Sequence, residues 1–378
     1  MSSEKKVHIL YVLTKLELGG AQKVCLSLID GIKKDGGFGG LISGDQGVLV
    51  DQVKKNDSVY LLDSFKREVS FRSLFFELKA FAQMILRMRK LKKEHPEIIV
   101  HTHSTKAGIL GRWAAFFAGI KKRIHTVHGF GFHDYQNKIS WFLIYFLEYI
   151  TCFVTTHYVC VSESDQKIGS KLLPRFKGKS SVIRAAVDWD KFYIPAVSIK
   201  ETQNFVIGTT SCFKPQKNLI DMLKAFKLAC FTNENLLLQI IGDGVLRPDI
   251  QAWIIKNKME KRIELLGWQD DVSKWMKNWD LFVMSSLWEG LPCAIVEARL
   301  SKLPVISYDI AGIHEVIKDG INGFLVAAGD WQALSQKIDL VVRDKDLHGR
   351  MQAYKDDLNR FHNKAMVREH LDLYRKLV

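Results

Sequence analysis

Two consecutive series of short apolar runs, each alternating with helical segments, constrain the fold of this chain most strongly. The first series begins at residues 7–13 and the second at residues 205–210. Short apolar runs that alternate with amphipathic helices are typical of parallel strands buried between layers of helices. Because the two series are similar in length, we predict an α/β chain with two Rossmann-like domains facing a central cleft.

The expected domain boundaries follow the break between the two series. Residues 189–204 show no clear period, so we predict a linker there, between a first domain at 1–188 and a second at 205–360. The final segment, 361–378, is predicted to be a helix that returns toward the first domain. A chain of 378 residues is long enough for this division.

The most informative local motif is an acidic loop that leads into a helix. Residues 285–298 follow the strand-like run 281–284, and Pro292 is predicted to be the first helical residue. Glu289 then lies in the loop, and Glu297 lies about one and a half turns into the helix. A helix N-terminus suits a phosphate, and carboxylates accept hydrogen bonds from sugar or ribose hydroxyls. An ordinary βα unit with solvated acids is the alternative interpretation.

Small and polar residues also follow the strands of the first series. Gly19 and Gly20 form a strand-to-helix turn, where backbone N–H groups can approach a phosphate, although a plain tight turn has the same pattern. His103 and His128 stand at strand ends, where ligands bind in open α/β sheets. No carboxylate completes a metal site among the histidines of residues 101–128, so we expect no metal and interpret His128 as a substrate contact.

The positive charge of the chain is concentrated in its first half. Residues 1–185 contain 29 Lys and Arg against 16 Asp and Glu, a net charge of +13, whereas residues 186–378 contain 26 against 25. This asymmetry indicates an anionic partner for the first half: nucleic acid, a membrane surface or a phosphorylated substrate. No recognition helix, aromatic RNA platform or zinc finger is evident, so nucleic acid is excluded.

A basic stretch with interleaved aromatic residues covers residues 66–93. It contains nine Lys and Arg, with phenylalanine and methionine at roughly helical spacing. Such a helix can lie on an anionic membrane surface. The alternative is a crossover helix that packs its apolar face on a sheet and leaves its basic face in water. The apolar run 141–161 is interrupted by polar residues and falls short of a membrane span.

The cysteines and the N-terminal residues indicate a cytoplasmic protein. The six cysteines form no CxxC pair, which favours a reducing compartment and no structural zinc. Residues 1–6 are polar and lead directly into a strand, so no signal peptide is expected.

Together these motifs resemble glycosyltransferase family 4, a family of retaining nucleotide-sugar transferases with the GT-B fold. The resemblance covers nearly the whole chain. It is carried by the following segments: Gly19-Gly20, Thr126–Gly129, the basic loop 211–218, Gly242–Gly244, the Glu-x7-Glu signature at Glu289 and Glu297, and the His-Glu-Val after Gly312. The segment 102–112 resembles a subgroup that assembles bacterial capsule, O-antigen and exopolysaccharide.

The resemblance implies a role for each matched residue. The implied catalytic residues are His128, Lys217 and Glu289. The implied donor-binding residues are Gly19, Gly20, Lys214, Lys217, Gln269, Glu289, Gly290, Leu291, Cys293, Ala294 and Glu297, and the acceptor-side residues are His103 and Lys106. Lys217 would contact the donor phosphate, Glu289 the sugar and Glu297 the ribose. No metal or other cofactor is implied.

One position departs from the family pattern. The family often has an arginine five residues before the phosphate lysine, and here that position is Cys212. Lys214 is the candidate replacement, although an ammonium group cannot form the bidentate fork of a guanidinium. Two alternative functions are therefore kept: a catalytically silent partner subunit that binds nucleotide-sugar or membrane, and a nucleotide-sugar epimerase.

The implied reaction transfers a hexose from a nucleotide-sugar, with UDP as the expected nucleotide, to a polysaccharide precursor. The expected acceptor is a lipid-linked saccharide, because a lipid diphosphate would suit the basic first domain. We therefore expect a cytoplasmic protein that binds peripherally at the inner face of the plasma membrane.

Overall fold

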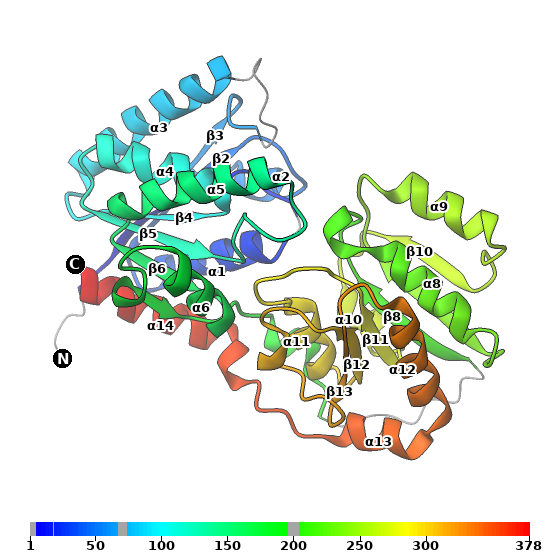
Figure 1. Ribbon diagram of the computed structural model, residues 1–378. Helices are drawn as coiled ribbons and strands as arrows, with labels where there is room; N and C mark the ends of the chain where they lie inside the picture. The colour runs from blue at the N-terminus through cyan, green and yellow to red at the C-terminus, as the bar shows by residue number, and fades with distance from the viewer. Residues whose placement is uncertain (1–4, 18, 67–73, 196–203) are drawn as a thin grey trace. The chain divides into compact units, whose positions relative to one another are not determined.

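The computed structural model divides the chain into two compact units. Unit 1 comprises Met1–Ala186 and Asn363–Val378, and unit 2 comprises Val187–His362. The structure describes residues 5–17, 19–66, 74–195 and 204–378. Each unit is a parallel sheet with helices on both faces (Figure 1), as the alternating apolar runs predict.

Unit 1 is built on a sheet of seven parallel strands among its described residues, in the order β3-β2-β1-β4-β5-β6-β7. The strands are β1 (His8–Val12), β2 (Phe38–Gly44), β3 (Val59–Leu62), β4 (Ile99–His103), β5 (Lys122–Val127), β6 (His157–Cys160) and β7 (Ser180–Val182). The direction of the strand order reverses between β1 and β4. In open parallel sheets, the ligand crevice lies at such a reversal, beyond the carboxyl ends of the strands.

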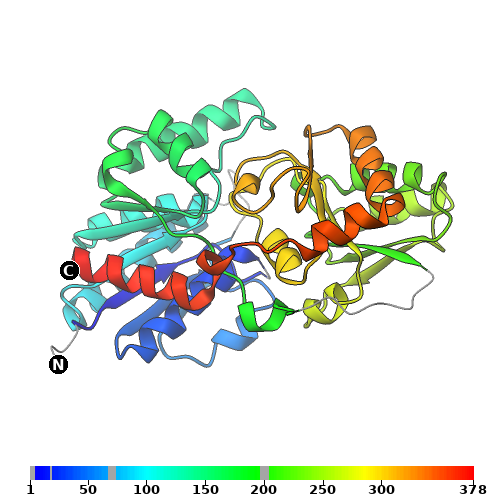
Figure 2. The same cartoon turned by 90° about the horizontal axis from the view of Figure 1, so that it is seen from below.

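Helices cover both faces of this sheet. They are α1 (Gly20–Lys34), α2 (Val50–Val53), α3 (Leu74–Glu94), α4 (Thr105–Phe117), α5 (Lys138–Thr151), α6 (Glu163–Leu172) and α14 (Asn363–Leu377), with the 3-10 turns η2 (Cys152–Val154) and η3 (Lys177–Lys179). Leu10 and Val12 belong to the core under α3 and α4. The alternate residue Tyr11 faces α14, which lies along α1 (Figure 2). Because successive side chains of β1 point to opposite faces of the sheet, this strand packs against the helices on both faces.

The helix α3 tests the two interpretations of the basic stretch. Its residues Ala80, Met84 and Met88 are buried in the core, whereas Lys90 and Lys93 are exposed. This is the packing that the crossover-helix interpretation predicts for the middle of the helix, whereas Phe75 and Phe76 at its start are exposed. Residues 67–73 of the stretch lie outside the described part of the chain.

Unit 2 contains six parallel strands among its described residues, in the order β10-β9-β8-β11-β12-β13. The strands are β8 (Phe205–Thr210), β9 (Leu236–Ile241), β10 (Ile263–Gly267), β11 (Leu281–Met284), β12 (Val305–Tyr308) and β13 (Gly323–Val326). The helices are α7 (Trp189–Phe192), α8 (Leu219–Ala229), α9 (Arg247–Lys256), α10 (Val272–Met276), α11 (Cys293–Leu300), α12 (Trp331–Arg343) and α13 (Lys345–Ala353), with η4 (Pro215–Lys217), η5 (Ile313–Glu315) and η6 (Asn359–Phe361). Here the strand order reverses between β8 and β11.

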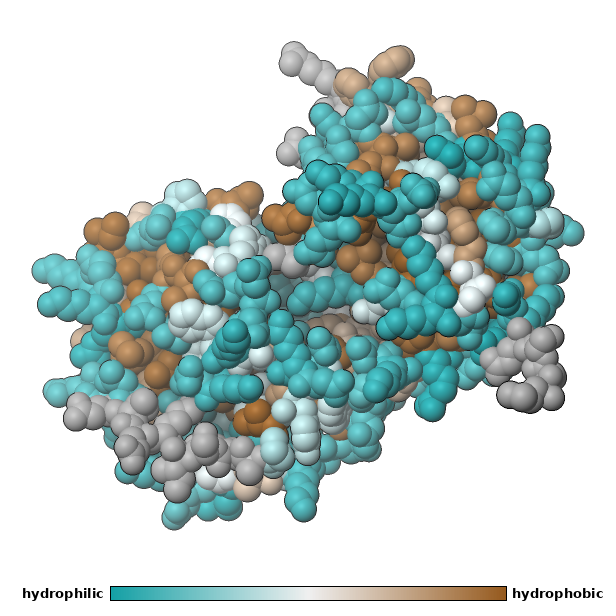
Figure 3. Space-filling model, turned by 180° about the vertical axis from the view of Figure 1, so that it is seen from behind, coloured by the Kyte–Doolittle hydropathy of each residue, from teal (hydrophilic) through white to brown (hydrophobic). Residues whose placement is uncertain are grey.

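The predicted linker, 189–204, is partly helical, because α7 occupies its first residues. The part at 196–203 lies outside the described residues. Within the described chain, no helix is both long enough and apolar enough to cross a membrane. The surface seen in Figure 3 is mostly hydrophilic, with hydrophobic side chains in separate groups.

Candidate active site

The strand order of unit 2 brings the two most informative sequence motifs together. The basic loop follows β8, and the acidic loop follows β11, the strand that pairs directly with β8. Both loops therefore leave the sheet at its carboxyl edge, on either side of the reversal in strand order. This is the position at which open α/β sheets bind ligands.

An ion pair joins the two loops. The Nζ of Lys217 contacts Oε1 of Glu289, and both side chains are largely buried. Burial alone would lower the pKa of the Lys217 ammonium, but the facing Glu289 carboxylate offsets this effect, so the pKa is raised. Lys217 is therefore held as a cation, beside the thiols of Cys212 and Cys293.

Two residues that the sequence analysis missed hold this pair in place. Gln216 Nε2 donates to the Trp288 carbonyl at 2.7 Å and to Glu289 Oε2 at 3.4 Å. Ser285 Oγ donates to the Lys217 carbonyl at 2.9 Å. In the sequence, Gln216 is marked only by standing next to Lys217, and Ser285 only by following β11. Neither position has a characteristic spacing that would identify the hydrogen-bond partner of the side chain.

The helix α11 begins one residue later than predicted. Pro292 is the N-cap residue in an extended conformation, and its carbonyl accepts from the Ile295 N–H at 2.9 Å. Pro292 therefore precedes the helix, and Cys293 and Ala294 stand in the first turn, where N–H groups lack intrahelical acceptors. Glu297 is half-buried further along the same helix.

Close backbone packing fixes the loop between β11 and α11. Gly290 and Leu291 are buried. Gly312, at φ +80°, lies so near that a Cβ on it would be 1.9 Å from the Gly290 carbonyl oxygen. A side chain at position 312 would therefore displace the acidic loop.

The remaining predicted donor residues lie on neighbouring loops of the same edge. Gln269 follows β10, and its amide is held by the Leu266 carbonyl at 2.7 Å and the Trp275 indole at 3.3 Å. Lys214 is half-buried at the start of η4, in the same loop as Cys212. The structure thus places all predicted unit 2 residues on loops beyond β8, β10 and β11 or on α11.

In unit 1, the equivalent edge is formed by the loops after β1 and β4. Gly19 is the N-cap residue of α1 in an extended conformation, and Gly20 is exposed at the helix start. Across the reversal in strand order, Thr14 Oγ1 bonds Ser104 Oγ at 2.8 Å. Ser104 has φ +63°, an uncommon conformation for a non-glycine residue, and it caps α4.

The two predicted histidines form a pair rather than two separate contacts. His103 Nδ1 and His128 Nε2 are 2.9 Å apart, so one ring donates and the other accepts. Burial, with His370 nearby, lowers the pKa of His128 to about 4, and burial also lowers the pKa of His103. Both rings are therefore neutral at pH 7.

The side chain of His103 is fully buried, since His101 stacks on it at 4.6 Å and Tyr11 lies at 5.8 Å. Its hydrogen bond to His128 orients that ring. The place of His103 on the acceptor side stays a prediction. Lys106 is also engaged, since its Nζ contacts both Glu77 on α3 and the Lys66 carbonyl.

Comparison with known proteins identifies the family. The model "Glycosyl transferases group 1" matches residues 190–357, and "Glycosyltransferase Family 4" matches residues 18–191. An Escherichia coli UDP-Gal:alpha-D-GlcNAc-diphosphoundecaprenol alpha-1,3-galactosyltransferase is 33% identical, over 92% of this chain and 91% of the relative. This chain belongs to glycosyltransferase family 4.

Other similar proteins and solved structures have lower sequence identity. A capsular polysaccharide biosynthesis glycosyltransferase, CapM, from Staphylococcus aureus is 26% identical over 75% of each chain. The structure of Anabaena Alr3699/HepE in complex with UDP and glucose aligns with a TM-score of 0.79 at 19% identity, over 97% of this chain and 99% of that one. The prediction of an α/β chain with two Rossmann-like domains of the GT-B fold class is confirmed, and the protein is a glycosyltransferase.

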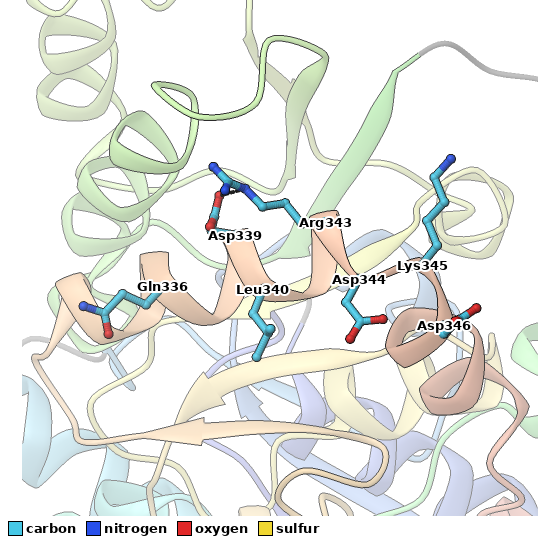
Figure 4. Close-up of a pocket in the computed structure, with 7 residues that line it drawn as sticks. All are labelled: Gln336, Asp339, Leu340, Arg343, Asp344, Lys345 and Asp346. Carbon is cyan, nitrogen blue, oxygen red and sulfur yellow. Dashed lines mark ion pairs between the residues drawn. The ribbon is translucent and has the colours of Figure 1, made fainter.

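A surface hollow elsewhere in this family 4 enzyme is separate from the predicted site. It has a volume of about 590 Å³ and is lined by Gln336, Asp339, Leu340, Arg343, Asp344, Lys345 and Asp346 (Figure 4). Its charged groups include an internal pair, Arg343 with Asp339 at 2.9 Å. None of the predicted donor residues lines it.

Among the described residues, no group of three or more His, Cys, Asp and Glu is arranged to hold a metal ion.

Proposed function

We propose that this family 4 enzyme is a retaining hexosyltransferase that uses a UDP-sugar donor and a lipid-linked saccharide acceptor. The proposed pathway is the assembly of a bacterial surface polysaccharide: capsule, O-antigen or exopolysaccharide. Support comes from the Escherichia coli relative, whose name specifies UDP-Gal and a diphosphoundecaprenol acceptor, and from the UDP complex of the Anabaena neighbour. The observation that carries the proposal is the Lys217–Glu289 pair at the β8/β11 edge.

In this proposal, Lys217 binds the diphosphate of the nucleotide-sugar and Glu289 binds its sugar. Cleavage between the anomeric carbon and the diphosphate builds negative charge on the leaving group, which a fixed cation stabilises. Lys217 supplies that cation, with Lys214 in the same loop. The first turn of α11 adds N–H dipoles at Cys293 and Ala294.

The carboxylates bind the neutral parts of the donor. When a donor enters, Glu289 accepts hydrogen bonds from sugar hydroxyls, and the Lys217 ammonium turns from the carboxylate toward the diphosphate. Glu297 binds the ribose, and Gln269 lies next to the base. His128, held neutral by burial, contributes a hydrogen bond rather than a charge. The leaving phosphate itself takes the acceptor proton, which is consistent with retention at the anomeric carbon.

Unit 1 is the proposed acceptor side, at the inner face of the plasma membrane. Its net positive charge favours a lipid diphosphate and an anionic membrane surface. Arg89, Lys90 and Lys93 on α3 are exposed and supply part of this charge. Lys106, in the first turn of α4, is a further acceptor-side residue in this proposal, although Glu77 pairs with it in the structure.

A thermal-shift screen with UDP-, GDP- and ADP-sugars tests the donor. A ligand that binds the folded state raises the unfolding temperature by mass action, so UDP-sugars should give the largest shift. NMR of the transfer product should then show the anomeric configuration of the donor. A larger shift with GDP- or ADP-sugars, or an inverted product, would contradict the proposal.

A silent partner subunit is the second candidate, because Cys212 replaces the family arginine. It predicts UDP binding with no transfer from any donor. Transfer by the purified chain alone excludes it.

A further inference from the structure

The helix α5 of unit 1 exposes many of its large apolar side chains. Its buried residues are Glu148 and Thr151, and Trp141 and Tyr145 pack against Phe132, whereas a second set of apolar side chains faces outward. We define the α5 apolar face as the exposed side chains of Ile139, Phe142, Leu143, Phe146, Tyr149 and, just beyond the helix, Phe153. These positions repeat at intervals of three and four residues, so they form one stripe along the helix.

Polar contacts hold α5 to the rest of unit 1 from the opposite side. Arg112 on α4 binds both carboxylate oxygens of Glu148, each at 2.8 Å, and the Tyr158 hydroxyl donates to Glu148 at 3.1 Å. The Trp113 indole donates to Thr151 at 3.0 Å. A buried, fully bonded ion pair fixes how the helix is rotated about its axis. The outward orientation of the apolar face is therefore built into the packing.

The exposure of this face is large. Ile139 is 82% exposed and Phe142 is 62% exposed. A contiguous apolar patch of this kind is uncommon on a protein with no partner and marks an interaction surface. On the neighbouring helix α4, Phe116 and Phe117 are also exposed; Figure 1 shows α3, α4 and α5 side by side.

Cationic groups surround the exposed phenylalanines at the end of α4. Arg123 lies 5.5 Å above the Phe116 ring, Arg89 donates to the Phe117 carbonyl at 3.2 Å, and Lys92 donates to the Gly119 carbonyl at 2.8 Å. Residues 98–162 contain only two acids, Asp134 and Glu148, and Glu148 is neutralised by Arg112. The surface therefore combines apolar side chains with uncompensated positive charge.

An anionic lipid bilayer fits both properties. Phenylalanine, leucine and isoleucine enter the boundary between headgroups and acyl chains, while lysine and arginine bind the headgroups. A second copy of this chain fits less well, because the same segment of the other copy would bring few anionic groups to this positive charge. A helix of 14 residues is also too short to span the membrane, and lies in its plane.

We propose that the α5 apolar face inserts into the cytoplasmic leaflet and is the surface by which unit 1 docks on the membrane. The inference rests on the proposed membrane-bound acceptor and identifies where contact occurs. It assigns the insertion to α5 rather than to the basic stretch 66–93, where Ala80, Met84 and Met88 are packed in the core and the exposed Phe75, Phe76 and Leu78 occupy only the start of α3. The lysines and arginines of α3 then act as electrostatic support.

The test is co-sedimentation of the full chain with vesicles of phosphatidylethanolamine and phosphatidylglycerol. The test variant is Phe142→Ser with Phe146→Ser, which leaves the Arg112–Glu148 pair intact. The matched controls are Phe75→Ser on α3 and Phe231→Ser in unit 2, each on an exposed phenylalanine. Binding is measured at low salt and near 1 M salt, where charge interactions are screened within about 3 Å.

We expect the wild type and both controls to remain bound at high salt. The double variant should lose about a hundredfold in partitioning, because two large apolar side chains no longer enter the lipid. UDP-induced thermal stabilisation of the double variant should equal that of the wild type, which verifies the fold.

Three outcomes would overturn the assignment. One is vesicle binding by the double variant equal to that of the wild type, and another is no binding by the wild type. The third is a wild-type dimer in light scattering that the double variant converts to monomer, which would make the face a self-association surface. Vesicle binding requires no transfer reaction, so absence of transferase activity alone would contradict only the proposed function.

Discussion

Lys217 and Glu289 form an ion pair that joins the loop after β8 to the loop after β11. The two residues are far apart in the sequence and meet because their strands are neighbours in the sheet. The strand order reverses between those two strands, which opens the crevice that a ligand needs. The pair is therefore a consequence of topology as well as of residue type.

Replacing Glu289 by Gln should separate sugar binding from nucleotide binding. The amide keeps the shape of the carboxylate but loses the charge that holds Lys217 and binds the sugar hydroxyls. We expect kcat to fall by about 10²–10³, while the affinity for UDP changes less than about threefold. UDP release and calorimetric titration measure the two quantities. Glu260→Gln, on an exposed carboxylate, is the control and should behave as wild type.

Cys212→Arg tests whether the missing guanidinium limits diphosphate binding. Cys212 lies within electrostatic range of Lys217, so an arginine there would add a second cation with a bidentate fork. We expect UDP affinity to rise about tenfold, or about 1.4 kcal/mol. Unchanged or weaker binding would show that Lys214 already supplies this charge.

The histidines of unit 1 should make the protein acid-sensitive. Burial lowers the pKa of His370 from 6.5 to about 4. Burial, together with the nearby His370, also lowers the pKa of His128 to about 4. A folded-state pKa below the unfolded value means that stability is complete above about pH 6.5 and is lost as the pH falls toward 4. For His370 alone, the loss should reach roughly 3 kcal/mol.

Thermal unfolding of the full chain between pH 7 and about 4.5 measures this loss. His370→Gln should reduce the acid dependence, because the ring that must be protonated is gone. His314→Gln is the control, since His314 is exposed and pairs with Asp309. An equal acid dependence in wild type and His370→Gln would refute the assignment.

The Arg112–Glu148 pair gives a further stability prediction. Arg112→Met leaves the buried Glu148 carboxylate without its partner, so the free energy of unfolding should fall by about 3–5 kcal/mol. Arg112→Met combined with Glu148→Leu removes both charges and should recover most of that loss. Urea unfolding measures both variants; a double variant no more stable than the single one would contradict the account.

The sequence was sufficient for the fold because the pattern of strands is local. Apolar runs such as residues 205–210 and 281–284 can be recognised as strands from their own residues, without knowing which segments they pair with. The acidic signature also predicted the loop and helix, with an error of one residue at Pro292, because a proline suits the N-cap nearly as well as the first turn.

What the sequence could not predict depends on pairing between distant segments. The ring of His103 packs against Tyr11 of β1, and His370 of α14 packs against the neighbouring His101, so this burial depends on segments far away in the sequence. The exposure of the α5 apolar face was hidden for the same reason: periodicity shows that a helix has an apolar face, but not which way that face points. The contacts of Arg112, Trp113 and Tyr158 with α5 decide this.

The most direct measurement is transfer of a labelled hexose from a UDP-sugar to a lipid diphosphate acceptor by wild type, Lys217→Ala and Lys256→Ala. Lys256 is an exposed lysine on α9 and serves as the matched control. The account predicts transfer by wild type and Lys256→Ala, and a loss of at least about 10² in kcat/KM for Lys217→Ala. Equal transfer by all three proteins would contradict the central role of the Lys217–Glu289 pair.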